Sequence, residues 1–280
     1  MPASQVTLCA YVQFLSRSFS SVTSVKNYLN GVRLLHLFKG LTFPPVSFLL
    51  SLTLRGIGKQ LFRQPTQAMP IGPHELIAIW RSMDFNDATA STMFCLFMFL
   101  FFLMSRKSSL IPPSRAQYSH LRYPCRGDVS IASFGLWVQL KYSKTNQFGL
   151  RNFTIPLVAI PHSPLCPVRA FRIMCRMVPG TAHTPLFSLP TLQGPLTVTH
   201  VYFNNYLKSA LRAAGLPLVF FNGHSFRRGG ATWAFKHGVP GEVIQLLGGW
   251  TSDAYLRYLS FSQEVKIAAA TTFAKGVSRG

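Results

Sequence analysis

The sequence predicts a mainly α-helical protein with a small antiparallel β-sheet, an α+β fold divided into two domains. Three observations support this fold class. Apolar residues recur at three- to four-residue spacing in much of the chain, two β-rich runs flank a turn, and a polar, proline-bearing segment interrupts the helical pattern near residue 65. A chain of 280 residues is long enough to bury a core in each of two domains.

The spacing of apolar residues in residues 1–64 predicts a small helical domain. Three helices are expected, at residues 6–17, at residues 21–38, and from just after Pro45 to about residue 62. Ser21 or Ser24 provides the N-cap of the second helix. Residues 65–71 are polar and contain two prolines, so they are the expected linker between the domains.

Residues 72–280 predict a larger helical domain that contains the sheet. Helices are expected at residues 73–83, at residues 88–105 and over most of the chain after residue 167, whereas residues 107–131 are expected to be irregular. Residues 136–142 and 151–158 alternate in polarity on either side of a turn, which predicts a β-hairpin.

The most apolar stretch, residues 93–104, does not predict a membrane span. Its twelve residues fall short of the roughly 20 needed to cross a bilayer, so a buried core helix is expected. The N-terminus lacks a basic region followed by an apolar one, and no signal peptide is expected. The five cysteines include no Cys-x-x-Cys pair, which argues against a disulfide framework or zinc site and fits a reducing compartment.

The charge balance points to a polyanionic partner. The chain has 28 Lys and Arg against 7 Asp and Glu, a formal net charge of +21, and its first 74 residues contain no acid. Nucleic acid is the commonest partner of such a surface; a solvated basic face and a membrane-surface patch are the alternatives. The candidate nucleic-acid-binding residues are Arg17, Lys26, Arg33, Lys39, Arg55, Lys59, Arg63 and Arg228.

Reactive side chains gather in the last fifth of the chain, in GHSFRRGGATWAFKHGVPGEVIQLLGGWTSDAYLRYL. His224 and Arg227 are three residues apart and share one face of a helix. Trp250 and Tyr258 follow one short helix later. The combination suits a site that holds a phosphodiester and attacks it with a phenol.

Breaking a phosphodiester without water or metal needs a nucleophile, cationic donors for the non-bridging oxygens and an acid for the leaving oxygen. Arginine suits the second task because its planar group donates two hydrogen bonds and stays charged. Further upstream, Arg106 follows the apolar helix in FFLMSRKSSLIP, and Lys144 lies in the predicted hairpin turn KYSKTNQFG.

In this order and spacing the motifs resemble those of the tyrosine recombinases, the site-specific DNA recombinases and integrases. The resemblance covers most of residues 70–262, whereas residues 1–64 match only as a helical core-binding domain. The stretches SKT, PLCPVRAF, HSFRRGGAT and GGWTSDAYLRYL are similar to recombinases of eukaryotic mobile elements, the Cryptons and DIRS-like retrotransposons.

The resemblance implies six catalytic residues: Arg106, Lys144, His224, Arg227, Trp250 and Tyr258. The two arginines and the histidine would bind the scissile phosphate, and the tryptophan would add a donor. The tyrosine would form a 3′-phosphotyrosyl linkage while the lysine protonates the leaving 5′-oxygen. No metal or other cofactor is expected, and no ATP is required because the linkage conserves the bond energy.

The resemblance also implies partners and assembly. Two domains would clamp double-stranded DNA as a C shape, and synapsis would need a homotetramer, with a monomer or dimer off DNA. Residues 263–274 are expected to form a helix that docks on a neighbouring subunit. A nuclear location follows from the subfamily resemblance alone.

Two departures leave alternatives open. Many relatives carry an acid where this chain has Ser109, and many separate the last two motif residues by nine positions rather than eight, which keeps Tyr255 as a minor candidate nucleophile. Lys141 is the alternative to Lys144 as the reactive lysine. The alternative functions are a catalytically inactive DNA-binding protein of the same fold, a type IB topoisomerase and a basic polyanion-binding module.

Overall fold

The computed structural model describes residues 2–61, 68–141, 153–250 and 252–258, together with positions 267, 270, 271 and 274. Only the backbone is described at residues 257 and 258. The chain divides into two compact units, Met1–Thr66 and Gln67–Gly280. The division falls within the segment of residues 65–71.

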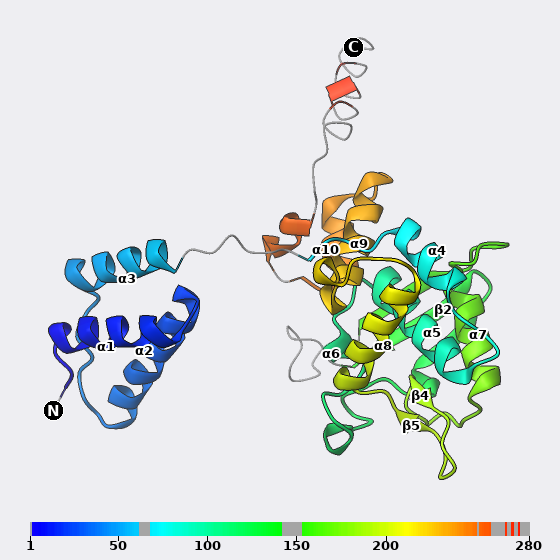
Figure 1. The fold of residues 1–280 in the computed structure, drawn as a ribbon, viewed down its shortest axis with the longest axis horizontal. Coiled ribbons are helices and arrows are strands. Elements are labelled where there is room, and N and C mark those ends of the chain that lie inside the picture. Colours follow the sequence, from blue (N-terminus) through cyan, green and yellow to red (C-terminus); the bar gives the residue numbers. More distant parts are fainter. Residues whose placement is uncertain are drawn as a thin grey trace. The chain divides into compact units, whose positions relative to one another are not determined.

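The first unit consists of three helices, α1 (Gln5–Ser18), α2 (Val22–Phe38) and α3 (Phe48–Gln60) (Figure 1). Each begins at a serine whose hydroxyl accepts a backbone N–H of the first turn. The predicted helices are therefore confirmed, and Ser21 is the cap of α2. The third begins a few residues later than expected because Ser47, rather than the proline pair, provides its cap. The core of the unit consists of Leu8, Val12, Leu15, Val25, Leu29, Leu50 and Ile57.

The second unit is larger and mostly helical. Its longer helices are α4 (Pro73–Arg81), α5 (Ala88–Phe102), α7 (Pro167–Met177), α8 (His200–Ala213), α9 (Gly223–Lys236) and α10 (Gly241–Gly248). Short helical turns are α6 (Lys107–Leu110), η1 (Arg115–Gln117), η2 (Arg126–Asp128), η3 (Leu218–Phe220) and η4 (Asp253–Tyr258). Residues 107–131, predicted to be irregular, therefore contain short helical turns, and a strand described below.

Helix α5 forms the centre of the second unit. The carboxylate of Asp87 accepts the backbone N–H groups of Thr89 and Ala90, which fixes the start of the helix. Every residue from Ala90 to Phe101 is buried, since the core closes around the helix on all sides. The predicted buried core helix is confirmed. No helix in the described part of the chain is long and apolar enough to cross a membrane.

The sheet has one strand more than the sequence predicted. Strands β1 (Val129–Ala132), β2 (Gly135–Leu140) and β3 (Phe153–Val158) form an antiparallel sheet in that order. The pairing of β2 with β3 confirms the predicted hairpin. Strand β1 escaped prediction because its outer position leaves its middle residues exposed and gives it no alternating apolar pattern. A two-residue turn at residues 133 and 134 joins it to β2, which begins at Gly135 with a φ of +154°.

A second, two-stranded antiparallel sheet, β4 (Ser188–Leu189) with β5 (Leu196–Thr197), was not expected either. Its strands are two residues long, too short for a periodic pattern to be visible in the sequence.

Candidate functional site

The start of α9 is fixed by its own side chains. The amide oxygen of Asn222 accepts the backbone N–H of His224 at 2.8 Å, and the hydroxyl of Ser225 accepts the backbone N–H of Asn222 at 3.0 Å. This reciprocal cap satisfies N–H groups that the helix leaves without partners. It places His224 in the first turn, at the exposed edge of the unit.

Two glycines bring α9 against the rest of the unit. A β-carbon at Gly229 would lie 1.7 Å from the carbonyl oxygen of Ile71, and one at Gly230 would lie 2.1 Å from the carbonyl oxygen of Phe101. These distances leave no room for any side chain. The Arg-Arg-Gly-Gly motif, residues 227–230, therefore brings Arg227 directly beside the carboxyl end of α5.

Arg227 is held inside the protein, with 2% of its surface exposed. Its Nη1 donates to the carbonyl oxygen of Met104 and, at 2.8 Å, to that of Gly248. The centre of its guanidinium lies 3.5 Å from the centroid of the Trp250 ring. Backbone carbonyls on one side and an aromatic face on the other orient the cation.

The Gly-Gly-Trp motif makes this contact possible. A β-carbon at Gly248 would lie 1.6 Å from an atom of the Trp250 indole, so the ring occupies the space a side chain would need. Gly249 ends α10 in the left-handed conformation, with φ of +65°, and turns the chain back. Trp250 is buried with Met104, Ala231, Ile244 and Tyr255 in a small core of their own.

Arg106 approaches the same region from the turn after α5. It is the N-cap residue of α6 and is half-buried. Within the described ranges no hydrogen bond or ion pair engages its guanidinium. Partial burial lowers the pKa of the nearby His224 below 6.5, and the charges of Arg106, Arg227 and Lys107 lower this pKa further. A neutral imidazole among cations favours an anionic ligand, which would stabilise its protonated form.

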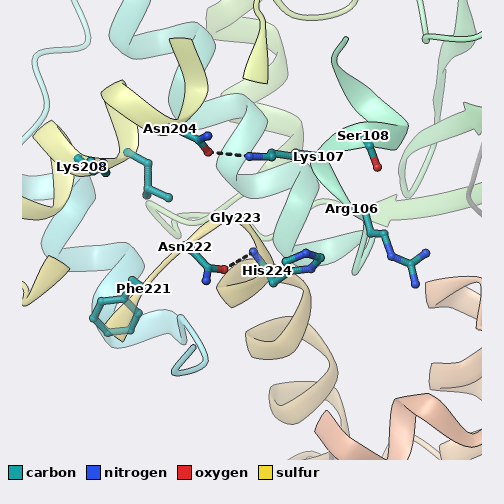
Figure 2. Close-up of a pocket in the computed structure, with 10 residues that line it drawn as sticks. Arg106, Lys107, Ser108, Asn204, Lys208, Phe221, Asn222, Gly223 and His224 are labelled. Carbon is teal, nitrogen blue, oxygen red and sulfur yellow. Dashed lines mark hydrogen bonds between the residues drawn. The ribbon is translucent and has the colours of Figure 1, made fainter. Parts of the chain in front are cut away.

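A pocket of about 580 Å³ lies beside Arg106 and His224. Figure 2 shows that Lys107 extends toward Asn204 of α8, whereas Arg106 extends away from it. Of the residues lining the pocket, four are basic or histidine and none is acidic. Sequence reasoning missed Lys107, Asn204 and Lys208, and the only available signal was that Lys107 is adjacent to Arg106.

The structure thus brings together four of the six predicted catalytic residues: Arg106, His224, Arg227 and Trp250. Lys144 lies outside the described residues. Tyr258 ends η4, and its side chain is likewise outside the described part. Helix η4 packs against α9 and α10, the helices that carry Arg227 and precede Trp250.

Two residues kept as alternatives have structural roles. The ring of Tyr255 is 7% exposed and lies 6.3 Å from that of Trp250, centroid to centroid, in the small core. Lys141 forms a 2.6 Å ion pair with Asp128 and donates to the carbonyl oxygen of His120. Both side chains are therefore engaged in packing or pairing.

Ser109, at the position of the missing acid, is 4% exposed within α6. Its backbone N–H donates to the carbonyl oxygen of Arg106 at 2.9 Å. A hydroxyl at this position carries no negative charge, and no acid is among the residues that line the pocket beside Arg106 and His224.

Six of the bases predicted to bind nucleic acid are exposed on the first unit: Arg17, Lys26, Arg33, Lys39, Arg55 and Lys59. Arg63 lies outside the described residues. Arg228 is half-buried, and its guanidinium donates to the carbonyl oxygen of Ala68 at 2.9 Å. This contact ties α9 to the segment that enters the second unit, so Arg228 also has a structural role.

Comparison with known proteins identifies the fold. No protein-family profile and no curated protein sequence matches the chain. Among solved structures, it is similar to the Tn1549 transposon integrase in complex with transposon right end DNA, with a TM-score of 0.64 and 12% identity over 97% of this chain and 86% of that one.

Two further solved structures are similar. The XerH site-specific recombinase in a post-cleavage complex has a TM-score of 0.61 and 15% identity, over 97% of this chain and 73% of that one. A lambda integrase dimer bound to a COC′ core site has a TM-score of 0.50 and 15% identity, over 90% and 76%. The share of the solved chain that is covered falls to 66% in the XerH pre-cleavage complex. The chain therefore has the fold of the tyrosine recombinases, mostly helical with a small antiparallel sheet.

Proposed function

We propose that this protein is a site-specific DNA recombinase or integrase that cuts and rejoins double-stranded DNA through a 3′-phosphotyrosyl intermediate. One observation carries the proposal: Arg106, His224 and the Arg227–Trp250 pair converge from segments far apart in the sequence, with no acid lining the pocket beside them. Such a site fits a phosphodiester held by cationic donors. The solved proteins of this fold include recombinases and integrases bound to DNA.

In the proposed reaction, the phenol oxygen of Tyr258 attacks the scissile phosphorus and bonds to it, and the phenol proton is released to water. The bond from phosphorus to the 5′-oxygen breaks, and Lys144 donates a proton to that oxygen, which leaves as a hydroxyl. Arg106 and Arg227 neutralise the non-bridging oxygens. Attack by a 5′-hydroxyl on the phosphotyrosine reverses the step, joins the strand and frees the tyrosine, so no nucleotide hydrolysis is required.

The fixed orientation of Arg227 is central to the proposed site. Two carbonyls and an indole orient the guanidinium of Arg227 before any ligand binds. A donor fixed in advance needs little reorganisation when charge develops on the phosphate oxygens. We assign Trp250 a double role, packing against Arg227 and donating its indole N–H to the phosphate.

The finer features of the proposal follow from the sequence motifs. The protein originates in a eukaryotic mobile element of the Crypton or DIRS-like type and acts in the nucleus. A core-binding domain at residues 1–64 and a catalytic domain at residues 72–280 form a C-shaped clamp on DNA. Synapsis uses a homotetramer. The docking of a helix at residues 263–274 on a neighbouring subunit lies mostly outside the described residues. Deletion of residues 262–280 is expected to abolish recombination while largely sparing DNA binding at one site.

The covalent intermediate provides the direct test. Pooled genomic or random duplexes that carry a nick as a suicide site would be incubated with the protein in EDTA, and covalent adducts would be captured under denaturing conditions. Wild type and Tyr255→Phe are expected to form the adduct, whereas Tyr258→Phe is expected to form none. Loss of the adduct in Tyr255→Phe but not in Tyr258→Phe would identify Tyr255, rather than Tyr258, as the nucleophile.

The proposed acid has its own test on a captured sequence. Replacing the bridging 5′-oxygen by sulfur provides a leaving group that departs as a thiolate and needs no proton. Cleavage by Lys144→Gln is expected to recover on this substrate, whereas cleavage by Arg227→Met is expected to stay impaired. Lys141→Gln, which removes the ion pair with Asp128 and the hydrogen bond to the carbonyl oxygen of His120, is the matched control.

Ser109 favours one alternative, a DNA-binding protein of this fold that lacks chemistry. Its hydroxyl provides no carboxylate to support the cations of the site. Tight binding to duplex DNA, with no adduct from any pooled sequence, would support this alternative over the recombinase.

A further inference from the structure

The pocket beside the proposed phosphate site contains a lysine that the reaction does not use. Nζ of Lys107 donates to the amide oxygen of Asn204 at 2.6 Å and lies 5.5 Å from the centroid of the Phe203 ring. Burial lowers the pKa of this lysine. In the described part of the chain no carboxylate pairs with it. An ammonium that is partly desolvated without a counter-charge favours an anionic ligand.

The stem of Lys107 is fixed as well as its end. A β-carbon at Gly223 would lie 3.3 Å from Cδ of Lys107 and 3.3 Å from Cε1 of Phe203. The aliphatic stem therefore lies close to the α9 backbone and to an aromatic ring of α8. A side chain held in this way loses little conformational entropy when it binds a ligand.

The hydrogen-bonding groups left in the pocket are mostly donors. The amide oxygen of Asn204 already accepts from Lys107, and that of Asn222 accepts from the backbone of His224. The remaining groups include the two amide NH₂ groups and the ammonium groups of Lys107 and Lys208, which only donate, and the hydroxyl of Ser108, which can donate or accept. A ligand that only accepts hydrogen bonds satisfies these donors, and a phosphate is such a ligand, whereas the major-groove edge of a base pair presents a donor as well as acceptors.

Arg106 and Lys107 are consecutive in the sequence, but their side chains reach different parts of the site. Arg106 has extended backbone at the N-cap of α6, and Lys107 is the first residue of the helix. Their side chains extend to opposite sides (Figure 2). Two cations that diverge from one turn reach two anionic groups more readily than one, and a DNA strand presents such groups at every nucleotide.

We propose that this pocket is a second phosphate subsite, in which Lys107 and Lys208 bind a backbone phosphate next to the one held by Arg106, His224 and Arg227. Asn204 is a positioning residue that orients Lys107. The proposal rests on the proposed function, because it takes DNA as the ligand. In this proposal the two lysines contribute to the affinity for DNA and help to set the register in which the strand enters the site.

The first measurement is the salt dependence of binding to a duplex of arbitrary sequence. Losing one phosphate contact reduces the slope of log K against log salt concentration by about 0.9. Lys107→Met, which keeps the aliphatic stem, is expected to show this reduction and roughly tenfold weaker binding at low salt. Lys236→Met, an exposed lysine at the other end of α9, is the matched control and is expected to change neither.

The second measurement locates the phosphate. A duplex captured in the adduct experiment would carry one neutral methylphosphonate, placed at the scissile linkage or at either neighbour. Wild type is expected to lose affinity at the scissile linkage and at one neighbour. Lys107→Met is expected to lose no further affinity at that neighbour and to remain sensitive at the scissile linkage, whereas Arg106→Met is expected to show the reverse.

The outcomes separate the possible failures. If Lys107→Met unfolds at lower urea but keeps the wild-type salt slope, Lys107 is only a structural tie between α6 and α8, and the subsite is wrong. If Lys107→Met becomes insensitive at the scissile linkage instead, the lysine belongs to the first site and the subsite is again wrong. In both cases the recombinase proposal stands. Wild type that binds no duplex at all overturns both proposals.

Discussion

The two units carry their positive charge in different ways. In the first, all six described bases predicted to bind nucleic acid are exposed side chains, and its residues include no acid. In the second, Arg227 is enclosed by backbone and indole, and Lys107 is held by an amide. Exposed charge attracts a polyanion at a distance without fixing its position, whereas enclosed charge holds one phosphate in one place.

The glycines show the same contrast. A β-carbon at Gly31 or Gly56 in the helices of the first unit would meet nothing within 4 Å. At Gly229, Gly230 and Gly248 in the second it would overlap backbone or the Trp250 ring. These two helical glycines of the first unit therefore tolerate a side chain, whereas the second unit depends on close contacts that position Arg227.

The largest expected effect is on the free energy of unfolding, which glycine substitutions in the two units should change in opposite directions. Gly229→Ala is expected to lower the free energy of unfolding by roughly 4 kcal/mol, because the carbonyl of Ile71 cannot move aside as a side chain does. Gly56→Ala is expected to raise it by up to about 1 kcal/mol through the helix preference of alanine. All four tryptophans lie in the second unit, so their fluorescence in urea follows that unit and circular dichroism follows both. An unchanged fluorescence midpoint for Gly229→Ala would contradict the close contact.

The next largest effects distinguish Arg227, which contributes to both stability and the proposed activity, from Arg106, which contributes mainly to the activity. Arg227→Met leaves the carbonyls of Met104 and Gly248 without their donor and is expected to cost about 2 to 3 kcal/mol of stability, besides abolishing the adduct. Arg106→Met is expected to change stability by less than about 0.5 kcal/mol. It is nevertheless expected to slow adduct formation by roughly 100-fold or more. Urea unfolding and single-turnover cleavage would be compared; equal losses of stability would contradict the difference in burial.

A smaller effect concerns pH. Since the pKa of His224 is lowered in the folded protein, its contribution to stability is complete above pH 6.5 and is lost as the pH falls through the folded value. A bound phosphate raises this pKa, so DNA binding takes up a proton. Duplex affinity is therefore expected to rise as the pH falls from 8 to about 6.

This rise is expected to flatten in His224→Gln. His200, whose pKa is also lowered, first by burial and then by Lys107, provides the control. Its ring contacts the carbonyl oxygen of Ile111 and does not line the pocket beside Arg106 and His224, so His200→Gln is expected to keep most of the pH dependence of binding. Isothermal titration in two buffers of different ionisation enthalpy would count the protons.

The smallest effect is expected on the first unit. Lys59→Gln removes one exposed charge and is expected to leave stability within about 0.5 kcal/mol of wild type. The slope of log affinity against log salt is expected to fall by about 0.9, as for any single phosphate contact. An unchanged slope would place Lys59 away from DNA.

Sequence reasoning worked best where the signal is local. The three helices of the first unit, the buried α5 and the β2–β3 hairpin follow from patterns within about ten to twenty residues, and the structure has all of them. Strand β1 and the β4–β5 pair were missed because their pairing partners, rather than their own patterns, make them strands. The roles of Lys144 and Tyr258 stay predictions.

The sequence by itself determined the α+β class and the order of arginine, histidine, arginine, tryptophan and tyrosine, since helical periodicity and motif spacing are properties of neighbouring residues. Only the tertiary structure decided that Arg227 lies against Met104, 123 positions away, and that Lys107 meets Asn204, 97 positions away. Such contacts depend on how closely helices approach. That approach is set by the space left at Gly223, Gly229 and Gly230, which no local pattern encodes.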